Sequence, residues 1–308
     1  MIESSEERSG VIFAIAAYTF WGFGPVYFKL VDAVPATEVL GHRIVWSVVF
    51  LVGILAFRRQ LGTLADTLKD RRILGLLMIS AVLIAINWVT YIWAVQSGHI
   101  LQASLGYYIN PLVSVSLGIV VLRERLRLLQ IVAVVLAATG TTYLAVVHGS
   151  LPWASLILAF SFGCYGLVRK TLAVGALQGL AVETLLLMPL ALGYLGLLAM
   201  QGQGHFAAGD GLLSGLLVAA GMVTILPLVW FANAARRLPL SMVGFFQYIA
   251  PTVNFILAIS VYGEAFGADQ TVTFVLIWAA LGLYTWDAVR VRRHSRVWRD
   301  LRVGPAPE

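Results

Sequence analysis

Two stretches of the sequence decide the fold: Tyr108-Ile109-Asn110-Pro111 and Tyr248-Ile249-Ala250-Pro251. The second repeats the first at an offset of 140 residues, the difference between positions 248 and 108. The same offset relates the acidic residues that follow the two prolines, Glu124 and Glu264. Both copies lie in long apolar stretches, so the chain is predicted to be a duplicated membrane protein. Duplicated helical bundles with a binding site between their halves are a recurrent transporter design.

The composition supports a membrane protein. Of the 308 residues, 60% are hydrophobic and only 12% are charged, and the mean hydropathy is +0.88. A soluble protein needs more polar residues than this to cover its surface. In lipid, each spanning segment satisfies its own backbone as a helix of about 20 residues. The sequence therefore predicts an all-α polytopic membrane protein whose ten transmembrane helices cover residues 11–30, 36–57, 72–96, 101–122, 127–147, 151–170, 177–200, 211–235, 240–262 and 268–290.

The basic residues predict how the chain is oriented in the membrane. If the chain crosses ten times, all but Lys29 and Arg43 of the 21 Lys and Arg residues fall at the N-terminus, in the even-numbered links or after the last span. Basic links stay on the cytoplasmic side. Both termini are therefore predicted to be cytoplasmic. The same distribution accounts for the net charge of +6 without nucleic acid as a partner.

The offset also divides the chain. The two copies are five spans apart, and because five is odd, corresponding helices cross the membrane in opposite directions. The predicted organisation is two inverted five-helix repeats between two cytoplasmic tails: an N-terminal tail 1–10, a first repeat 11–147, a second repeat 151–290 and a basic C-terminal tail 291–308. Small residues at Ala133, Ala137 and Thr141 predict close helix packing.

Polar residues line up on one face of the fourth and ninth spans. In the fourth span, helical spacing gives a stripe of Tyr107, Asn110 and Ser114. In the ninth span, it gives a stripe of Gln247, Pro251 and Asn254. Polar groups are costly when they face lipid, so both stripes are predicted to line a solute cavity. The alternative is that the prolines only kink the helices and the polar groups bridge neighbouring helices.

Four other spans add aromatic and amide side chains to the predicted cavity. These are Asn87 and Tyr91 in the third span, Trp230 and Asn233 in the eighth, Trp21 in the first and Tyr165 in the sixth. Aromatic rings with a few amides suit an organic solute with a flat or apolar body. Aromatic residues also gather at membrane interfaces, which is the expectation for Trp88, Trp93, Trp153 and Trp278.

Arg43 is the most costly residue in the spans, because it lies about 10 Å deep in the second one. A charge at that depth needs a partner. One hypothesis pairs it with Glu38 as an outer gate and makes Glu183 the counterpart near the cytoplasmic side, with Asp32 as the third available acid. His42, next to Arg43, is a further gate candidate, because histidine is the residue type that can change its charge near neutral pH. The alternative is that Arg43 snorkels to the interface and only anchors its helix.

Several functions are excluded or disfavoured by what the sequence lacks. Its three lysines, Lys29, Lys69 and Lys170, belong to no Walker motif, so the chain does not drive transport by its own ATP hydrolysis. Its histidines show no zinc-binding spacing, and it has neither a His-Glu-x-x-His nor a Gly-x-Ser-x-Gly motif. The prediction is a protein that is not an enzyme, with no catalytic residues, no metal and no cofactor.

Several longer motifs point to a family. They include Phe20-Trp21-Gly22, Ala103-Ser104-Leu105-Gly106-Tyr107 and Gly244-Phe245-Phe246-Gln247-Tyr248-Ile249. From about Gly10 to Arg290 the chain resembles the RarD-type permeases, of the EamA branch of the drug/metabolite transporter superfamily. The resemblance implies ten helices in two inverted repeats, a location in the bacterial inner membrane and transport of small organic molecules.

Together, these features predict a secondary transmembrane transporter that works by alternating access. It is expected to be an exporter or facilitator of a small organic metabolite or drug-like solute, embedded in membrane lipid. A proton or a counter-substrate is the candidate for coupling, and no required protein partner is evident. The alternative is a transmembrane channel or pore for small solutes, which would need a ring of selectivity groups. Saturable flux that a counter-substrate stimulates would distinguish the transporter from the channel.

Overall fold

The computed structural model describes residues 2–96, 100–147, 153–261 and 268–302, and these are helical apart from short links. The helices are α1 (Ile2–Gly22), α2 (Gly24–Leu30), α3 (Ala36–Phe57), α4 (Leu61–Lys69), α5 (Arg71–Gln96), α6 (Ile100–Val120), α7 (Leu128–Val147), α8 (Trp153–Thr171), α9 (Ala176–Met200), α10 (Gly211–Arg237), α11 (Leu240–Gln247), α12 (Ile249–Ser260) and α13 (Ala268–Arg302). Each of the ten predicted spans coincides with one helix or with a broken pair. Glu264 lies outside the described residues.

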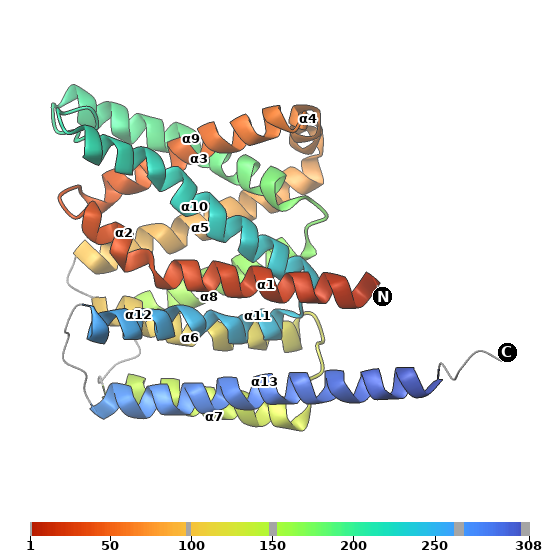
Figure 1. Ribbon diagram of the computed structural model, residues 1–308. Coiled ribbons are helices and arrows are strands. Elements are labelled where there is room, and N and C mark those ends of the chain that lie inside the picture. The colour runs from red at the N-terminus through yellow and green to blue at the C-terminus, as the bar shows by residue number, and fades with distance from the viewer. Residues whose placement is uncertain (1, 97–99, 148–152, 262–267, 303–308) are drawn as a thin grey trace.

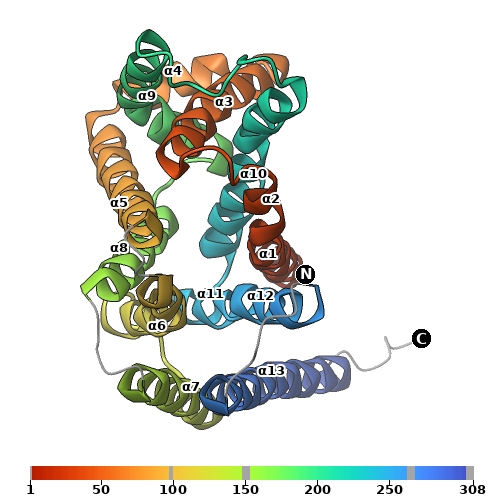
Figure 2. The ribbon, with the colours of Figure 1, turned by 90° about the vertical axis from the view of Figure 1, so that its left-hand side faces the viewer.

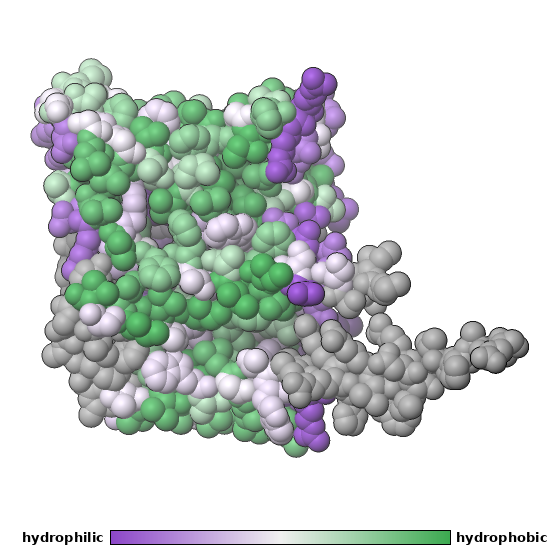
Figure 3. All heavy atoms as spheres, viewed as in Figure 1, coloured by the Kyte–Doolittle hydropathy of each residue, from purple (hydrophilic) through white to green (hydrophobic). Residues whose placement is uncertain are grey.

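The surface is that of a membrane protein. Among the described residues, six segments are long and apolar enough to cross a bilayer, and α6 and α13 contain the shorter apolar helices Gly106–Val120 and Thr271–Asp287. Figure 3 shows a broad hydrophobic band across the visible face of the bundle, with hydrophilic residues gathered towards its two ends. Large apolar side chains such as Leu190 lie exposed on the outside, which lipid favours and water does not. The prediction of an all-helical polytopic membrane protein is confirmed.

Two predicted spans are broken into two helices each. The first breaks at Phe23, between α1 and α2, where Pro25 lies in the first turn of α2. The ninth breaks at Tyr248, between α11 and α12, three residues before Pro251. Proline has no backbone N–H, so it cannot complete the helical hydrogen bond to the carbonyl four residues earlier. Pro111, in contrast, lies inside the continuous helix α6.

The ends of the helices alternate between two sides of the bundle. The start of α1, the end of α13 and the short helix α4 all lie at one end, here called the terminal end (Figure 1). The links from α8 to α9 and from α10 to α11 lie at the same end, whereas α2 and the link from α9 to α10 lie at the opposite end. The first and last helices also extend into the predicted tails 1–10 and 291–308.

The two parts of the chain interlock. The main helix pairs join residues 2–147 to residues 153–302: α1 with α10, α3 with α9 and α10, α5 with α8, α6 with α8 and α11, and α7 with α13. In Figure 2, α7 and α13 form a separate pair, while α1, α3, α5, α6, α8, α10, α11 and α12 are arranged around a common centre. The middle of the bundle is therefore built from both parts.

Small residues allow the closest approaches between these helices. A Cβ atom on Gly22 would come within 2.5 Å of Val253 Cβ, where α1 meets α12. A Cβ atom on Gly244 would come within 2.8 Å of the Pro111 carbonyl oxygen, where α11 meets α6. Ala133 and Ala137 are fully buried in α7, which packs on α13. The predicted close packing of that stripe is confirmed.

Candidate transport site

The seam between α6 and α11–α12 joins the two predicted polar stripes. Gln247 Nε2 donates a hydrogen bond of 3.0 Å to Ser114 Oγ, and both side chains are buried. Within the described part of the chain, the amide oxygens of Asn110, Gln247 and Asn254 are buried and accept no hydrogen bond. A buried acceptor without a donor costs about 1–3 kcal/mol. The seam is therefore a place where a donor group of a solute would be stabilised.

The repeated proline motifs also meet at this seam. Tyr248 Oη donates a hydrogen bond of 3.3 Å to the backbone carbonyl of Tyr108, so the two motif tyrosines are in contact. Pro111 and Pro251 deprive the carbonyls of Tyr107 and Gln247 of their helical donors, because each lies four residues earlier. The prolines thus remove two helical donors in the region where the three amide oxygens accept no hydrogen bond from the described residues.

A second group of polar and aromatic residues surrounds Arg43. Its Nε donates a hydrogen bond of 2.9 Å to Thr224 Oγ1 on α10. The guanidinium carbon lies 5.2 Å from the ring centroid of Trp88 on α5 and 5.8 Å from that of Phe28 on α2. The Arg43 cluster is defined here as Arg43 together with Tyr27, Phe28, Trp88, Tyr91, Tyr107 and Thr224, since the guanidinium also interacts electrostatically with the three tyrosines.

The Arg43 cluster draws on five helices and remains partly accessible. The rings of Tyr91 and Tyr107 meet edge to face, with centroids 6.0 Å apart. Tyr107 keeps 46% of its surface exposed and Arg43 is half-buried. Trp88, which was expected at the membrane interface, instead faces the guanidinium. The cluster therefore offers a cation, hydroxyl groups and ring faces to whatever enters it.

The hypothesis that Glu38 forms an ion pair with Arg43 is wrong, and the alternative, in which Arg43 is an anchor, does not need that pair. Glu38 accepts hydrogen bonds from the backbone N–H of His205 at 2.7 Å and from its Nδ1 at 2.8 Å, and His42 Nε2 lies 3.9 Å away. Positions five residues apart differ by about 140° around a helix, so the two side chains of α3 point in different directions. No acid of the described chain, Asp32 and Glu183 included, forms an ion pair with Arg43.

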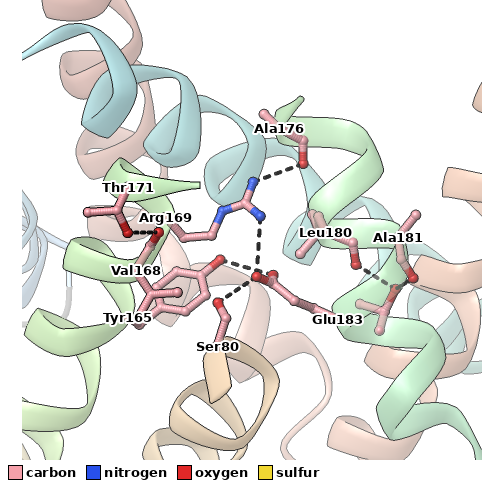
Figure 4. Close-up of polar contacts among 10 residues, drawn as sticks. Ser80, Tyr165, Val168, Arg169, Thr171, Ala176, Leu180, Ala181 and Glu183 are labelled. Atoms are coloured by element: carbon pink, nitrogen blue, oxygen red, sulfur yellow. Dashed lines mark hydrogen bonds and ion pairs between the residues drawn. The ribbon is translucent and has the colours of Figure 1, made fainter. Parts of the chain in front are cut away.

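Glu183 is the centre of a separate buried network, shown in Figure 4. Its carboxylate accepts hydrogen bonds from Ser80 Oγ at 2.6 Å, Arg169 at 3.3 Å and Tyr165 Oη at 3.3 Å. Arg169 and Glu183 are each only 1% exposed. A second nitrogen of Arg169 donates to the Ala176 carbonyl. Glu183, predicted as one side of a gate, therefore has Arg169 as its ion-pair partner.

Sequence reasoning missed Arg169, because it was counted among the basic residues of a cytoplasmic link. A signal was present: Arg169 falls within the predicted span 151–170 and lies four residues after Tyr165, on the same face of the helix. The hydroxyl of Tyr165 is bonded to Glu183, and its ring stacks on Phe231 with centroids 5.8 Å apart.

The remaining predicted site residues make contacts between or within helices. Asn87 donates to the Leu158 carbonyl at 2.9 Å and to Ser161 Oγ at 3.0 Å, and so joins α5 to α8. Asn233 Oδ1 accepts from Arg237 at 2.7 Å. Trp21 packs with the rings of Tyr18, Phe162 and Phe231, and Trp230 packs on Phe20.

Charged contacts concentrate at the terminal end. Glu124 accepts hydrogen bonds from the backbone N–H groups of Leu240 at 2.6 Å and Ser241 at 3.0 Å, which open α11, and from Ser241 Oγ at 2.6 Å. Lys170 donates to the carbonyls of Ala235 and Leu238 at the end of α10. These charges suit the helix dipoles that they face. In the sequence, Glu124 stood out only because it corresponds to Glu264 at the repeat offset.

Two ion pairs join distant parts of the chain at the same end. Arg127 Nε lies 2.7 Å from Asp287 Oδ2, and Arg237 Nε lies 2.9 Å from Glu6 Oε2. Each pair links the first part of the chain to the second. The terminal end is therefore tied together by several charged contacts, whereas the Glu38–His205 contact lies at the opposite end.

Comparison with known proteins gives consistent matches. Residues 8–146 match the model of a family described as the EamA-like transporter family. Protein RarD of Salmonella typhi is 48% identical over 95% of this chain and 99% of its own length. The uncharacterized transporter YojE of Bacillus subtilis is 46% identical over 96% of this chain and 99% of its own. A solved crystal structure aligns with a TM-score of 0.70 at 17% identity, covering 92% of this chain and 99% of that one. That last similarity concerns the fold alone.

Proposed function

Because the chain belongs to the RarD-type group of the EamA-like transporter family, we propose that it is a secondary transporter of a small organic solute, acting by alternating access as an exporter or facilitator. Its relatives and its apolar helices make it a multi-pass membrane transporter of the drug/metabolite type rather than an enzyme. The mechanism and the solute class are the parts that the proposal adds.

The observation that carries the proposal is the seam between α6 and α11–α12. Three amide oxygens, those of Asn110 on α6, Gln247 on α11 and Asn254 on α12, lie buried there and accept no hydrogen bond among the described residues. Intramembrane polar groups are expensive and mark solute pathways. Their location between the two parts of the chain is where transporters built from repeats bind their solutes.

The helix pairs support two inverted repeats of five spans. Under a shift of five spans, the contact of α1 with α10 corresponds to that of α8 with α5. The pairs α3–α9, α6–α11 and α7–α13 each join a helix to its own counterpart. A pseudo-twofold arrangement of this kind allows the same contacts to be exchanged between two sides of the membrane.

The two ends of the bundle supply the contacts that would alternate. At the terminal end, Glu124 holds the start of α11. At the opposite end, Glu38 holds the link from α9 to α10 through His205. We assign the terminal end to the cytoplasm and the chain to a bacterial inner membrane, because basic links favour the cytoplasmic side and the compared relatives are bacterial.

Flux into proteoliposomes tests the proposal. Vesicles with and without the purified protein would be incubated with a pooled metabolite library, and their contents would be analysed by mass spectrometry. The expected result is uptake of a small set of organic solutes that saturates with concentration and is absent from empty vesicles. Uptake that rises linearly for all small solutes would contradict a transporter with a binding site.

A further inference from the structure

Arg43 is a membrane-embedded cation whose charge no side chain of the described protein neutralises. The available acids are otherwise engaged or distant: Glu183 pairs with Arg169, and Glu38 binds His205. Asp32 lies exposed outside the helices. A charge removed from water is costly unless it is paired. The protein keeps this charge in the middle of the Arg43 cluster, which is a functional signal rather than a structural one.

The guanidinium is only partly satisfied by its neighbours. It carries five N–H donors, of which Thr224 takes the one on Nε. The faces of Trp88 and Phe28 stabilise the positive charge, but they do not replace the in-plane acceptors that the fork of donors requires. A carboxylate presents two coplanar oxygens that match this fork and binds it through two parallel hydrogen bonds.

The chemistry of the other residues in the Arg43 cluster indicates what the rest of the ligand is like. Tyr91 and Tyr107, whose rings lie 6.0 Å apart, bring hydroxyl groups to the cluster that an anion could accept, whereas the Tyr27 hydroxyl donates to the Leu216 carbonyl at 3.0 Å. Trp88 and Phe28 present flat apolar surface beside the charge. With a single cation in the cluster, a monoanion is balanced, whereas a doubly charged phosphate would be buried with an uncompensated charge.

We propose that Arg43 binds the carboxylate of the transported solute, and that the solute class is small organic monoanions with an apolar, preferably aromatic, body. The proposal rests on the transport function proposed above. The carboxylate sits on the guanidinium, and the apolar body lies against the rings of Trp88, Phe28 and Tyr107. Arg43 is then a specificity-determining residue, because neutral and cationic analogues leave its donors unpaired.

Ligand-induced thermal stabilisation of the full-length protein in a neutral detergent tests the class. The probes are benzoate, phenylacetate and indole-3-acetate, each compared with the primary amide of the same skeleton, together with phenyl phosphate and phenethylamine. At least one carboxylate is expected to raise the melting temperature saturably while its amide does not. In Arg43→Gln, the carboxylate loses a charge-assisted hydrogen bond. Its half-saturating concentration is therefore expected to be about tenfold higher, or more, than in the wild type.

Two further variants separate binding from folding. Arg43→Lys keeps the charge but loses the planar fork, so its half-saturating concentration should lie between those of the wild type and Arg43→Gln. Arg58→Gln, which changes an exposed arginine outside the site, should bind like the wild type. If Arg43→Gln does not fold, the wild type and Arg43→Lys still decide the question. The proposal then requires that the wild type prefers each carboxylate to its amide and that this preference is weaker in Arg43→Lys.

Each other outcome overturns the proposal. Equal stabilisation by amides and carboxylates, no stabilisation by any carboxylate, or wild-type binding by Arg43→Gln would leave Arg43 as a helix anchor. Stabilisation by phenyl phosphate alone would mean an oxyanion site of a different class. Saturable flux of neutral solutes in proteoliposomes would preserve the transport function and remove the carboxylate class. Carboxylate binding without any flux would preserve the carboxylate site and remove the transport function.

Discussion

At the scale of single residues, two arginines within the bundle have opposite surroundings. Arg169 is fully buried against the carboxylate of Glu183 and the Ala176 carbonyl. Arg43 is half-buried among rings and hydroxyl groups, with no acidic partner in the described chain. Removing one member of a buried pair strands the other, whereas removing an unpaired charge strands nothing. The two residues should therefore respond differently to the same substitution.

Arg169→Met is expected to destabilise the protein by about 3–5 kcal/mol, because Glu183 is left charged and buried. Arg43→Met should leave the stability of the ligand-free protein unchanged or raise it. Thermal unfolding in detergent measures both. The double variant Arg169→Met/Glu183→Gln should recover part of the loss. A larger destabilisation by Arg43→Met than by Arg169→Met would show that Arg43 has a structural partner and would refute its role as a solute ligand.

Two asparagines provide a second contrast at this scale. Asn110→Ala removes a buried amide whose oxygen accepts no hydrogen bond from the described protein, so it should reduce solute flux with little loss of stability. Asn87→Ala breaks two contacts that join α5 to α8 and should cost about 1–2 kcal/mol while the solute affinity stays near that of the wild type. Flux assays and melting temperatures on the same preparations compare them. Normal flux in Asn110→Ala would show that the solute pathway does not run through the seam.

Residue-level prediction succeeded where helical spacing decides the outcome. Spacing and offset placed Ser114 and Gln247 on facing stripes, and the hydrogen bond that the two side chains share is the bridging contact that the alternative expected. The solute cavity that the stripes were predicted to line stays a prediction. It failed for Glu38, whose partner His205 comes from a link more than 160 positions away. Spacing shows which side chains share a face, but it cannot show which distant link folds over that face.

At the scale of helices, local chemistry determines where helices end and break. The predicted span 36–57 coincides with α3, because the ends of a continuous apolar run mark the ends of the helix that crosses the bilayer. The breaks at Phe23 and Tyr248 were not predicted. A proline alone does not predict a break, because α6 continues through Pro111 whereas the helix before Pro251 is interrupted at Tyr248. Packing partners, and not the proline alone, decide between these outcomes.

The start of α11 depends on Glu124. Glu124→Ala removes the acceptor of two backbone N–H groups and a charge that suits the helix dipole, so it should cost about 1–2 kcal/mol and loosen the first turn of α11. Hydrogen exchange at Leu240 and Ser241 measures the local effect. Asp66→Ala, which breaks an exposed pair with Lys69, is the control and should change little. Unchanged exchange at α11 in Glu124→Ala would show that the cap does not hold the helix.

At the scale of the whole molecule, the two parts of the chain interlock, and both contribute residues to the Arg43 cluster and to the seam. The offset of 140 residues predicted which helices correspond, but not which helices pack together. Contacts such as α1 with α10 and α6 with α11 arise from shape complementarity across the chain, for which the sequence carries no periodic signal. The membrane-protein class followed from composition, because lipid tolerates the exposed apolar surface that water does not.

The proposed orientation has a direct test. Single cysteines would be introduced at Gln203, in the link from α9 to α10, and at Asp66, in α4, in a Cys164→Ala background. Both positions are exposed and lie in elements at opposite ends of the bundle. An impermeant thiol reagent applied to right-side-out cells should label position 203 and spare position 66. Labelling of position 66 alone would reverse the assignment of the two ends.

The central claim, alternating access through one central site, is tested most directly by counterflow. Proteoliposomes would be loaded with a high concentration of an unlabelled solute identified in the flux assay, and a trace of the labelled solute would be added outside. The account predicts that the label accumulates transiently above its equilibrium level, because exchange through one alternating site is faster than net release, and that Asn110→Ala reduces this overshoot. Label that only equilibrates, at a rate independent of the internal solute, would contradict the account.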